Sequence, residues 1–123
     1  MIFVFGGAYQ GKTDYALKEF GKETVCDISE AGEPDFTKDV ITGIDGFAAR
    51  LAAEGEVPAV WFDARRDQWA DKVLIVTDIS QGVVPIDKTL REAREANGRL
   101  MIYLASEAEQ VHRVFCGIGK RIK

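Results

Sequence analysis

The sequence predicts an α/β fold with a small, mostly parallel sheet, and two observations support this prediction. Apolar runs of strand length alternate along the chain with helical or irregular segments, and a glycine-rich segment directly follows the first of these runs. The chain has 123 residues and contains no repeat or linker-like composition. We therefore expect a single domain spanning residues 1–123.

The glycine-rich segment, residues 6–13, indicates which type of α/β fold to expect. The apolar run 2–5 leads into Gly6, Gly7, Ala8, Tyr9, Gln10, Gly11, Lys12 and Thr13, which fit the phosphate-binding pattern G-x-x-x-x-G-K-[ST]. Glycines at both ends let successive N–H groups point at phosphate oxygens, and Lys12 is expected to reach the β- and γ-phosphates. The Thr13 hydroxyl is expected to ligate Mg²⁺ carried by ATP or GTP. A strand before the motif and a helix after it predict a three-layer fold of the P-loop NTPase type; the alternative is a glycine-rich turn with a surface lysine.

The next elements follow from periodicity. Residues 14–20 have helical spacing with Gly21 as a stop, and residues 23–26 predict a second strand that ends at Asp27. The acidic segment 29–38 is typical of a loop, and residues 39–54 predict an amphipathic helix. Residues 57–70 predict another helix with Pro58 in its first turn. The alternative there is a strand at 59–62, which would make Asp63 a candidate magnesium ligand.

The third strand, residues 72–77, places four aliphatic residues before Asp78. In P-loop proteins an acid at this place commonly holds the metal, so Asp78 is our candidate magnesium ligand; the alternative is an aspartate that caps an ordinary turn. Residues 80–85 predict a loop, and Asp87 is expected to cap a long helix that ends near residue 108. The last predicted strand is 111–116, followed by a short glycine-containing end and a basic tail.

Ligands of parallel sheets bind beyond the carboxyl ends of the strands. This rule places the glycine-rich loop, Asp27 and Asp78 around one crevice. Asp27 is the carboxylate best placed to orient or deprotonate an acceptor hydroxyl, although a plain turn residue is an equal alternative. The expected catalytic residues are thus Lys12, Asp27 and Asp78, and the expected magnesium ligands are Thr13 and Asp78.

Composition excludes some partners. The net charge of −4 argues against nucleic acid, and no apolar run approaches the roughly 20 residues that cross a bilayer. Met1 leads directly into the first strand, so we expect no signal peptide and a cytoplasmic protein. Cys26 and Cys116 lie in apolar runs without metal-ligand spacing, so we expect them to be buried and reduced; the alternative is a disulfide or a metal role. Trp61, Phe62 and Trp69 are expected to be exposed and could be buried at a subunit contact of a homo-oligomer.

Both ends of the chain resemble a known family, the bifunctional adenosylcobinamide kinases / adenosylcobinamide-phosphate guanylyltransferases. Residues 2–13 are similar to the family's opening strand and its Gly-Gly-x-x-x-Gly-Lys-Ser/Thr loop. Residues 76–85 resemble the family's strand, acid and Gly-Ile-Val-Pro segment, with Asp78 at the position of a glutamate. Residues 91–104, with Ala-Asn-Gly-Arg-Leu at 96–100, resemble the family's helix, and residues 111–123 resemble its final strand and Gly-Ile-x-x-x-Ile-Lys ending.

The resemblance implies a shortened member that transfers a phosphoryl group from ATP or GTP to the aminopropanol hydroxyl of cobinamide, and that assembles into a homo-oligomer. Full-length members carry a nucleophilic histidine after the second strand, but residues 28–55 contain none. The lone His112 is expected to be a packed or edge residue of the last strand; the alternative is that it replaces the family's nucleophile. The sequence therefore does not support guanylyl transfer by the family's route. A non-catalytic nucleotide-binding regulatory or assembly subunit, and a small P-loop kinase for another alcohol, are the alternative functions.

Overall fold

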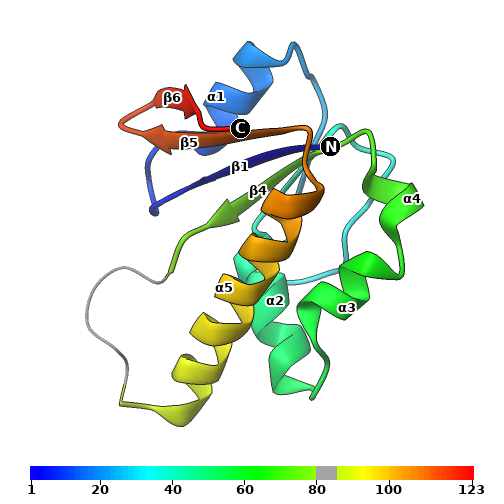
Figure 1. The fold of residues 1–123 in the computed structure, drawn as a ribbon, viewed down its shortest axis with the longest axis vertical. Helices are drawn as coiled ribbons and strands as arrows, with labels where there is room; N and C mark the ends of the chain where they lie inside the picture. The colour runs from blue at the N-terminus through cyan, green and yellow to red at the C-terminus, as the bar shows by residue number, and fades with distance from the viewer. Residues whose placement is uncertain (80–85) are drawn as a thin grey trace.

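A six-stranded, mostly parallel sheet forms the centre of the computed structural model, which describes residues 1–79 and 86–123 (Figure 1). The strand order is β2-β3-β4-β1-β5-β6, in which β6 runs antiparallel to β5 and every other pair is parallel. The strands are β1 (Ile2–Gly6), β2 (Val25–Asp27), β3 (Val40–Thr42), β4 (Val73–Thr77), β5 (Gln110–Phe115) and β6 (Ile118–Arg121). The predicted α/β class is confirmed, and the predicted loop at 80–85 lies outside the described residues.

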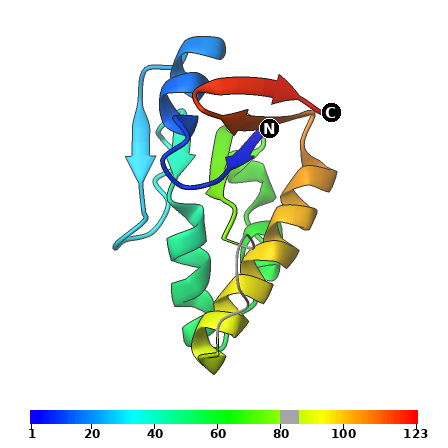
Figure 2. The same cartoon turned by 90° about the vertical axis from the view of Figure 1, so that its left-hand side faces the viewer.

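The helices cover the two faces of the sheet unequally. They are α1 (Lys12–Glu19), α2 (Ile44–Ala53), α3 (Pro58–Asp63), α4 (Arg66–Trp69) and α5 (Lys88–Glu107). On one face α1 packs Ala16 against Val4 and Val114 of the sheet, and on the other face the remaining helices form the larger core (Figure 2). Since side chains alternate along a strand, Phe3 of β1 faces that larger core while Val4 faces α1.

The prediction of one helix over residues 39–54 is wrong for its first residues. Val40–Thr42 form β3, which lies between β2 and β4, and α2 begins only at Ile44. Gly43 separates the two with a φ of 78°, and a Cβ there would come within 2.3 Å of the Ser29 amide nitrogen. Val40 and Ile41 are fully buried on opposite faces of the sheet, a pattern that the spacing of apolar residues alone does not distinguish from a helical face.

The predicted helix 57–70 is present as two short helices, α3 and α4, and the alternative strand is absent. The expectation that Phe62 and Trp69 are exposed is also wrong, because Phe62 is 0 % and Trp69 1 % exposed. Both rings lie in the larger core, and Trp61 is half-buried beside them. Asp63 forms an ion pair with Arg66 and accepts a hydrogen bond from the Tyr103 hydroxyl of α5.

The long helix α5 begins as predicted. The Asp87 carboxylate accepts a hydrogen bond from the Leu90 backbone N–H at 3.1 Å, which satisfies a donor of the first turn. Leu100 and Leu104 of this helix are fully buried, whereas Leu90 in its first turn is 58 % exposed. Across the described segments, no helix has the length and apolar character needed to cross a membrane.

The C-terminal segment folds back as a hairpin. The strand predicted at 111–116 corresponds to β5, and the segment after it, where the sequence predicts no further strand, contributes β6. Cys116 is exposed in the hairpin turn with a φ of 50°, and Cys26 is only half-buried, so the expectation of two buried cysteines is wrong; both thiols are free. The apolar run 111–116 ends at the hairpin turn, so its last residue, Cys116, lies outside the core.

His112 is packed inside the α1 face of the sheet, as expected for a lone strand histidine. It is 4 % exposed, its Nδ1 lies 2.9 Å from the Tyr15 hydroxyl, and its Nε2 lies 2.9 Å from Gln110 Oε1. Burial lowers the pKa of His112; the positive charge of Arg121 lowers it further and Glu19 opposes both effects.

This environment predicts a pH dependence of stability. Below an unfolded-state pKa of about 6.5 the unfolded chain binds a proton that the folded chain resists, so the free energy of unfolding falls as the pH decreases from 7.5 to 5.5. His112 is the only histidine, so a His112→Gln variant is expected to lose most of this dependence. Urea denaturation at the two pH values measures it. Equal slopes for both proteins would contradict the prediction.

Candidate functional site

The glycine-rich loop connects β1 to α1 and has an unusual backbone. Gly11 has a φ of 79°, and Tyr9 has a φ of 58°, a conformation that non-glycine residues adopt uncommonly. Gly6 packs against β5, where a Cβ would lie 2.3 Å from the Val114 carbonyl oxygen. The two glycines of the motif therefore have different uses: Gly11 supplies a left-handed turn, and Gly6 permits a close approach to the neighbouring strand.

Lys12 begins α1 and is folded back over the loop. Its Nζ donates a hydrogen bond of 2.7 Å to the Gly7 carbonyl oxygen, and the residue is only 8 % exposed. Burial lowers the pKa of Lys12, and the negative charge of Asp45 partly opposes this effect. A buried ammonium group that donates to a neutral carbonyl is a strong point of attraction for an anion, because pairing with an anion offsets the cost of burying its charge.

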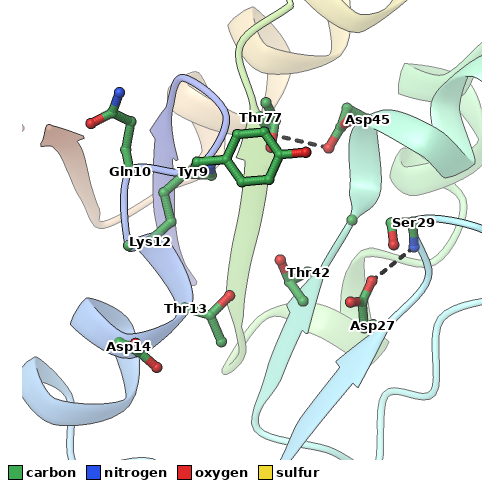
Figure 3. A pocket seen from close by; sticks show the side chains of 12 residues that line it. Tyr9, Gln10, Lys12, Thr13, Asp14, Asp27, Ser29, Thr42, Asp45 and Thr77 are labelled. Atoms are coloured by element: carbon green, nitrogen blue, oxygen red, sulfur yellow. Dashed lines mark hydrogen bonds between the residues drawn. The ribbon is translucent and has the colours of Figure 1, made fainter. Parts of the chain in front are cut away.

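A cavity of about 290 Å³ lies next to this lysine (Figure 3). One wall is the segment from Tyr9 to Asp14, and the other is formed where β2, β3 and β4 end. In Figure 3 the side chains of Asp27, Thr42 and Asp45 lie across the cavity from Thr13, and the Tyr9 ring extends over it. A cavity is thus present beyond the carboxyl ends of parallel strands, where the sequence predicts a crevice.

Asp27 lies in this cavity, where the sequence places it. The side chain is exposed, and its Oδ1 accepts a hydrogen bond of 2.9 Å from the Ser29 backbone N–H. That bond is typical of a turn-forming aspartate. Asp27 therefore stabilises the turn after β2 and presents a carboxylate to the cavity at the same time.

Asp78 lies beside the start of the glycine-rich loop. Its backbone N–H donates to the Gly6 carbonyl oxygen at 2.8 Å, directly after β4 pairs with β1. Within the described part of the chain, the lining of the cavity includes the preceding residue, Thr77, but not Asp78. The structure brings Asp78 next to the loop backbone, while Asp27 and Thr13 share the cavity itself.

Asp45 is a carboxylate of this site that the sequence did not reveal. It lies in the first turn of α2, and its Oδ1 accepts a hydrogen bond of 3.2 Å from the Thr77 backbone N–H. Its charge acts on Lys12 across the cavity. The sequence signal was an acid just after a strand and a glycine, but the interpretation of residues 39–54 as one helix placed Asp45 in mid-helix.

The donors around the cavity are all hard oxygen and nitrogen atoms. Asp14, Asp27 and Asp45 supply carboxylates, and Thr13 and Thr42 supply hydroxyl groups. Among residues 1–79 and 86–123, no three acidic, histidine or cysteine side chains cluster closely enough to hold a metal ion by themselves. Such a site suits a cation that arrives with an anionic ligand, because Mg²⁺ commonly uses one or two carboxylates together with substrate phosphates.

Comparison of the sequence with protein-family models and with curated proteins found no match.

Proposed function

We propose that the chain binds ATP or GTP with Mg²⁺ on the glycine-rich loop and transfers the terminal phosphoryl group to an acceptor hydroxyl. The observation that carries this proposal is Lys12, a buried ammonium group at the start of a helix, held over a left-handed glycine turn beside a cavity of polar side chains. A strand, an anion-binding loop and a helix N-terminus in this order are typical of P-loop NTPases, the fold type that we propose.

The loop backbone and Lys12 would contact different parts of the nucleotide phosphates. The backbone N–H groups from Gly7 to Thr13 would surround the β-phosphate, and Lys12 would exchange the Gly7 carbonyl for phosphate oxygens. Positioning and charge neutralisation supply most of the catalysis in phosphoryl transfer, so a preformed loop with one buried cation suits this reaction.

The site fits magnesium as a partner of the nucleotide. Thr13 and Asp78 would hold the ion as the sequence predicts, and Asp45, which unlike Asp78 lines the cavity, offers a further carboxylate. Bound Mg²⁺ neutralises charge that develops on the phosphate oxygens. Three carboxylates line the same cavity as this lysine, and their negative charge favours a phosphate that arrives with its cation over a free polyanion.

Asp27 would orient the acceptor hydroxyl, because its carboxylate lies in the cavity opposite Thr13. The resemblance of both chain ends to the cobinamide kinases suggests the aminopropanol hydroxyl of cobinamide as the acceptor. Guanylyl transfer is not part of the proposal. His112 is 4 % exposed, and its two ring nitrogens contact Tyr15 and Gln110 instead of a cavity.

Calorimetric titration with ATP and with GTP, each with and without Mg²⁺, tests binding, and a product assay with cobinamide tests transfer. We expect magnesium-dependent binding followed by cobinamide phosphate formation. Binding without turnover would favour a non-catalytic regulatory or assembly subunit, and turnover only on other alcohols would favour a different small kinase. The absence of any nucleotide binding would contradict the whole proposal.

Asp45 provides a specific prediction within this site. Asp45→Asn keeps an oxygen that can accept from the Thr77 N–H but removes the negative charge, so we expect affinity for the magnesium–nucleotide complex to fall by about tenfold. Affinity for the metal-free nucleotide should stay equal or rise, because repulsion between carboxylate and phosphate decreases. Titrations with Mg²⁺ and with EDTA measure both values.

Asp67→Asn, in the first turn of α4, is the matched control and should behave like the original protein. A loss of equal size with and without Mg²⁺ in the Asp45 variant would assign Asp45 a structural role instead.

A further inference from the structure

We propose that the turn of the C-terminal hairpin, residues 116–117, holds the glycine-rich loop in its anion-binding conformation, and that Gln10 is the positioning residue through which it acts. This inference rests on the proposed function, because it takes the glycine-rich loop to be the anion-binding element. The hairpin turn that holds the loop contains no part of the phosphate-binding motif. The two segments are more than 100 positions apart in the chain.

The contact consists of two hydrogen bonds to one residue. The Cys116 backbone N–H donates to the Gln10 side-chain Oε1 at 2.7 Å, and the Gly117 backbone N–H donates to the Gln10 carbonyl oxygen at 2.8 Å. Gln10 is therefore held through its main chain and its side chain at once. Such a double contact fixes both the position of the residue and the orientation of its peptide group.

Gln10 is flanked by two residues of the loop that have unusual backbone conformations. It lies between Tyr9 and Gly11, which both have positive φ angles. Gly11 also packs on the hairpin turn, since a Cβ there would lie 3.3 Å from the Gly117 Cα. A non-glycine residue such as Tyr9 keeps an uncommon backbone conformation only when its surroundings enforce it. The hairpin turn supplies that enforcement from one side.

The turn can restrain the loop because it is itself anchored. β6 pairs with β5 along its length, and Gly119 lies so close to the ring of Tyr15 in α1 that a Cβ would overlap it. The Tyr15 hydroxyl in turn contacts His112 of β5 at 2.9 Å. The hairpin, α1 and the loop between them form one connected unit.

All of these contacts are made by the protein's own atoms, so they can order the loop independently of an anion. Preorganisation raises affinity because the loop does not lose conformational entropy on binding. Loss of the Gln10 side-chain contact, with the main-chain bond from Gly117 still in place, should therefore weaken nucleotide binding without removing any group that contacts phosphate through its side chain. The core should be unaffected, since Gln10 lies outside both hydrophobic clusters.

The test compares Gln10→Ala with Gln10→Glu, whose carboxylate can still accept from the Cys116 N–H, and with Gln68→Ala as a control at an exposed glutamine of α4. Hydrogen exchange of the amides at 7–13 is measured without ligand, together with thermal midpoints and calorimetric affinity for MgATP and MgGTP. In Gln10→Ala we expect loop exchange to accelerate and affinity to fall, each by about tenfold, while the thermal midpoint changes by less than about 3 °C. Gln10→Glu should retain the slow exchange.

Unchanged loop exchange in Gln10→Ala would overturn the inference, and so would faster exchange with unchanged affinity. If the original protein binds neither nucleotide, the proposed function fails, while the exchange rates still decide whether the hairpin orders the loop. Should Gln10→Ala not fold, Gln10→Asn, whose side chain is one carbon shorter, serves in the same comparison.

Discussion

Replacement of Lys12 by alanine is expected to reduce nucleotide affinity and turnover by at least about a hundredfold while the fold survives. Lys12 is the buried cation of the cavity, and its Nζ lies 2.7 Å from a loop carbonyl that phosphate oxygens would replace. Because burial already lowers the pKa of Lys12, the folded protein bears a cost for this charge, and its removal should change stability little. Calorimetry, a phosphoryl-transfer assay and thermal unfolding measure the three quantities.

Two further variants test whether nucleotide binding depends on the charge of Lys12. Lys12→Met keeps a long side chain without the charge and should lose binding as severely as the alanine variant. Lys18→Ala removes an exposed lysine from the last turn of the same helix and should bind nucleotide normally. If Lys12→Ala retained its nucleotide affinity, the glycine-rich loop would have to be interpreted as an ordinary turn.

Trp69→Ala is expected to have the largest effect on stability, a loss of about 3–5 kcal/mol in the free energy of unfolding. The Trp69 ring is 1 % exposed and packs edge-on against Phe62 and Tyr103, so its removal leaves a large void between α4 and α5. Its Nε1 also donates a hydrogen bond of 2.9 Å to the Phe62 carbonyl oxygen, and the variant would lose this bond, although the Arg65 N–H would still donate to the same oxygen. A loss of this size is a large fraction of the stability of a small domain.

Urea denaturation followed by circular dichroism measures this loss and does not depend on the missing tryptophan. Val60→Ala, at a position of α3 that is 65 % exposed, is the control and should change stability by less than about 0.5 kcal/mol. A loss below about 1 kcal/mol for Trp69→Ala would mean that the contacts of α4 contribute little to the core.

Several elements could be predicted because their signals are local. β1, the glycine-rich loop and α1 follow from an apolar run, a motif and a helical period that lie next to one another in the chain. β4 is a run of buried aliphatic residues, and α5 begins at a capping aspartate. The position of Asp27 at the cavity also followed from the sequence, because the ends of parallel strands meet at one edge of a sheet.

Other features depended on contacts between distant segments. β3 is a strand because β2 and β4 supply partners on both sides, whereas its sequence also continues the helical pattern of α2. β6 forms from a polar tail because β5 offers an edge with which it can pair. Phe62 and Trp69 are buried because α2 and α5 cover them, a property that their neighbours in the sequence do not encode.

The sequence by itself therefore determined the α/β class, the phosphate-type motif and the helix that follows it, since these depend on residues close together in the chain. Only the tertiary structure decided that Asp45 faces Lys12 and that the turn at Cys116 and Gly117 holds Gln10. The physical reason is that both relationships join segments brought together by strand order and packing. A pattern read along one segment contains no information about the partner that folding places beside it.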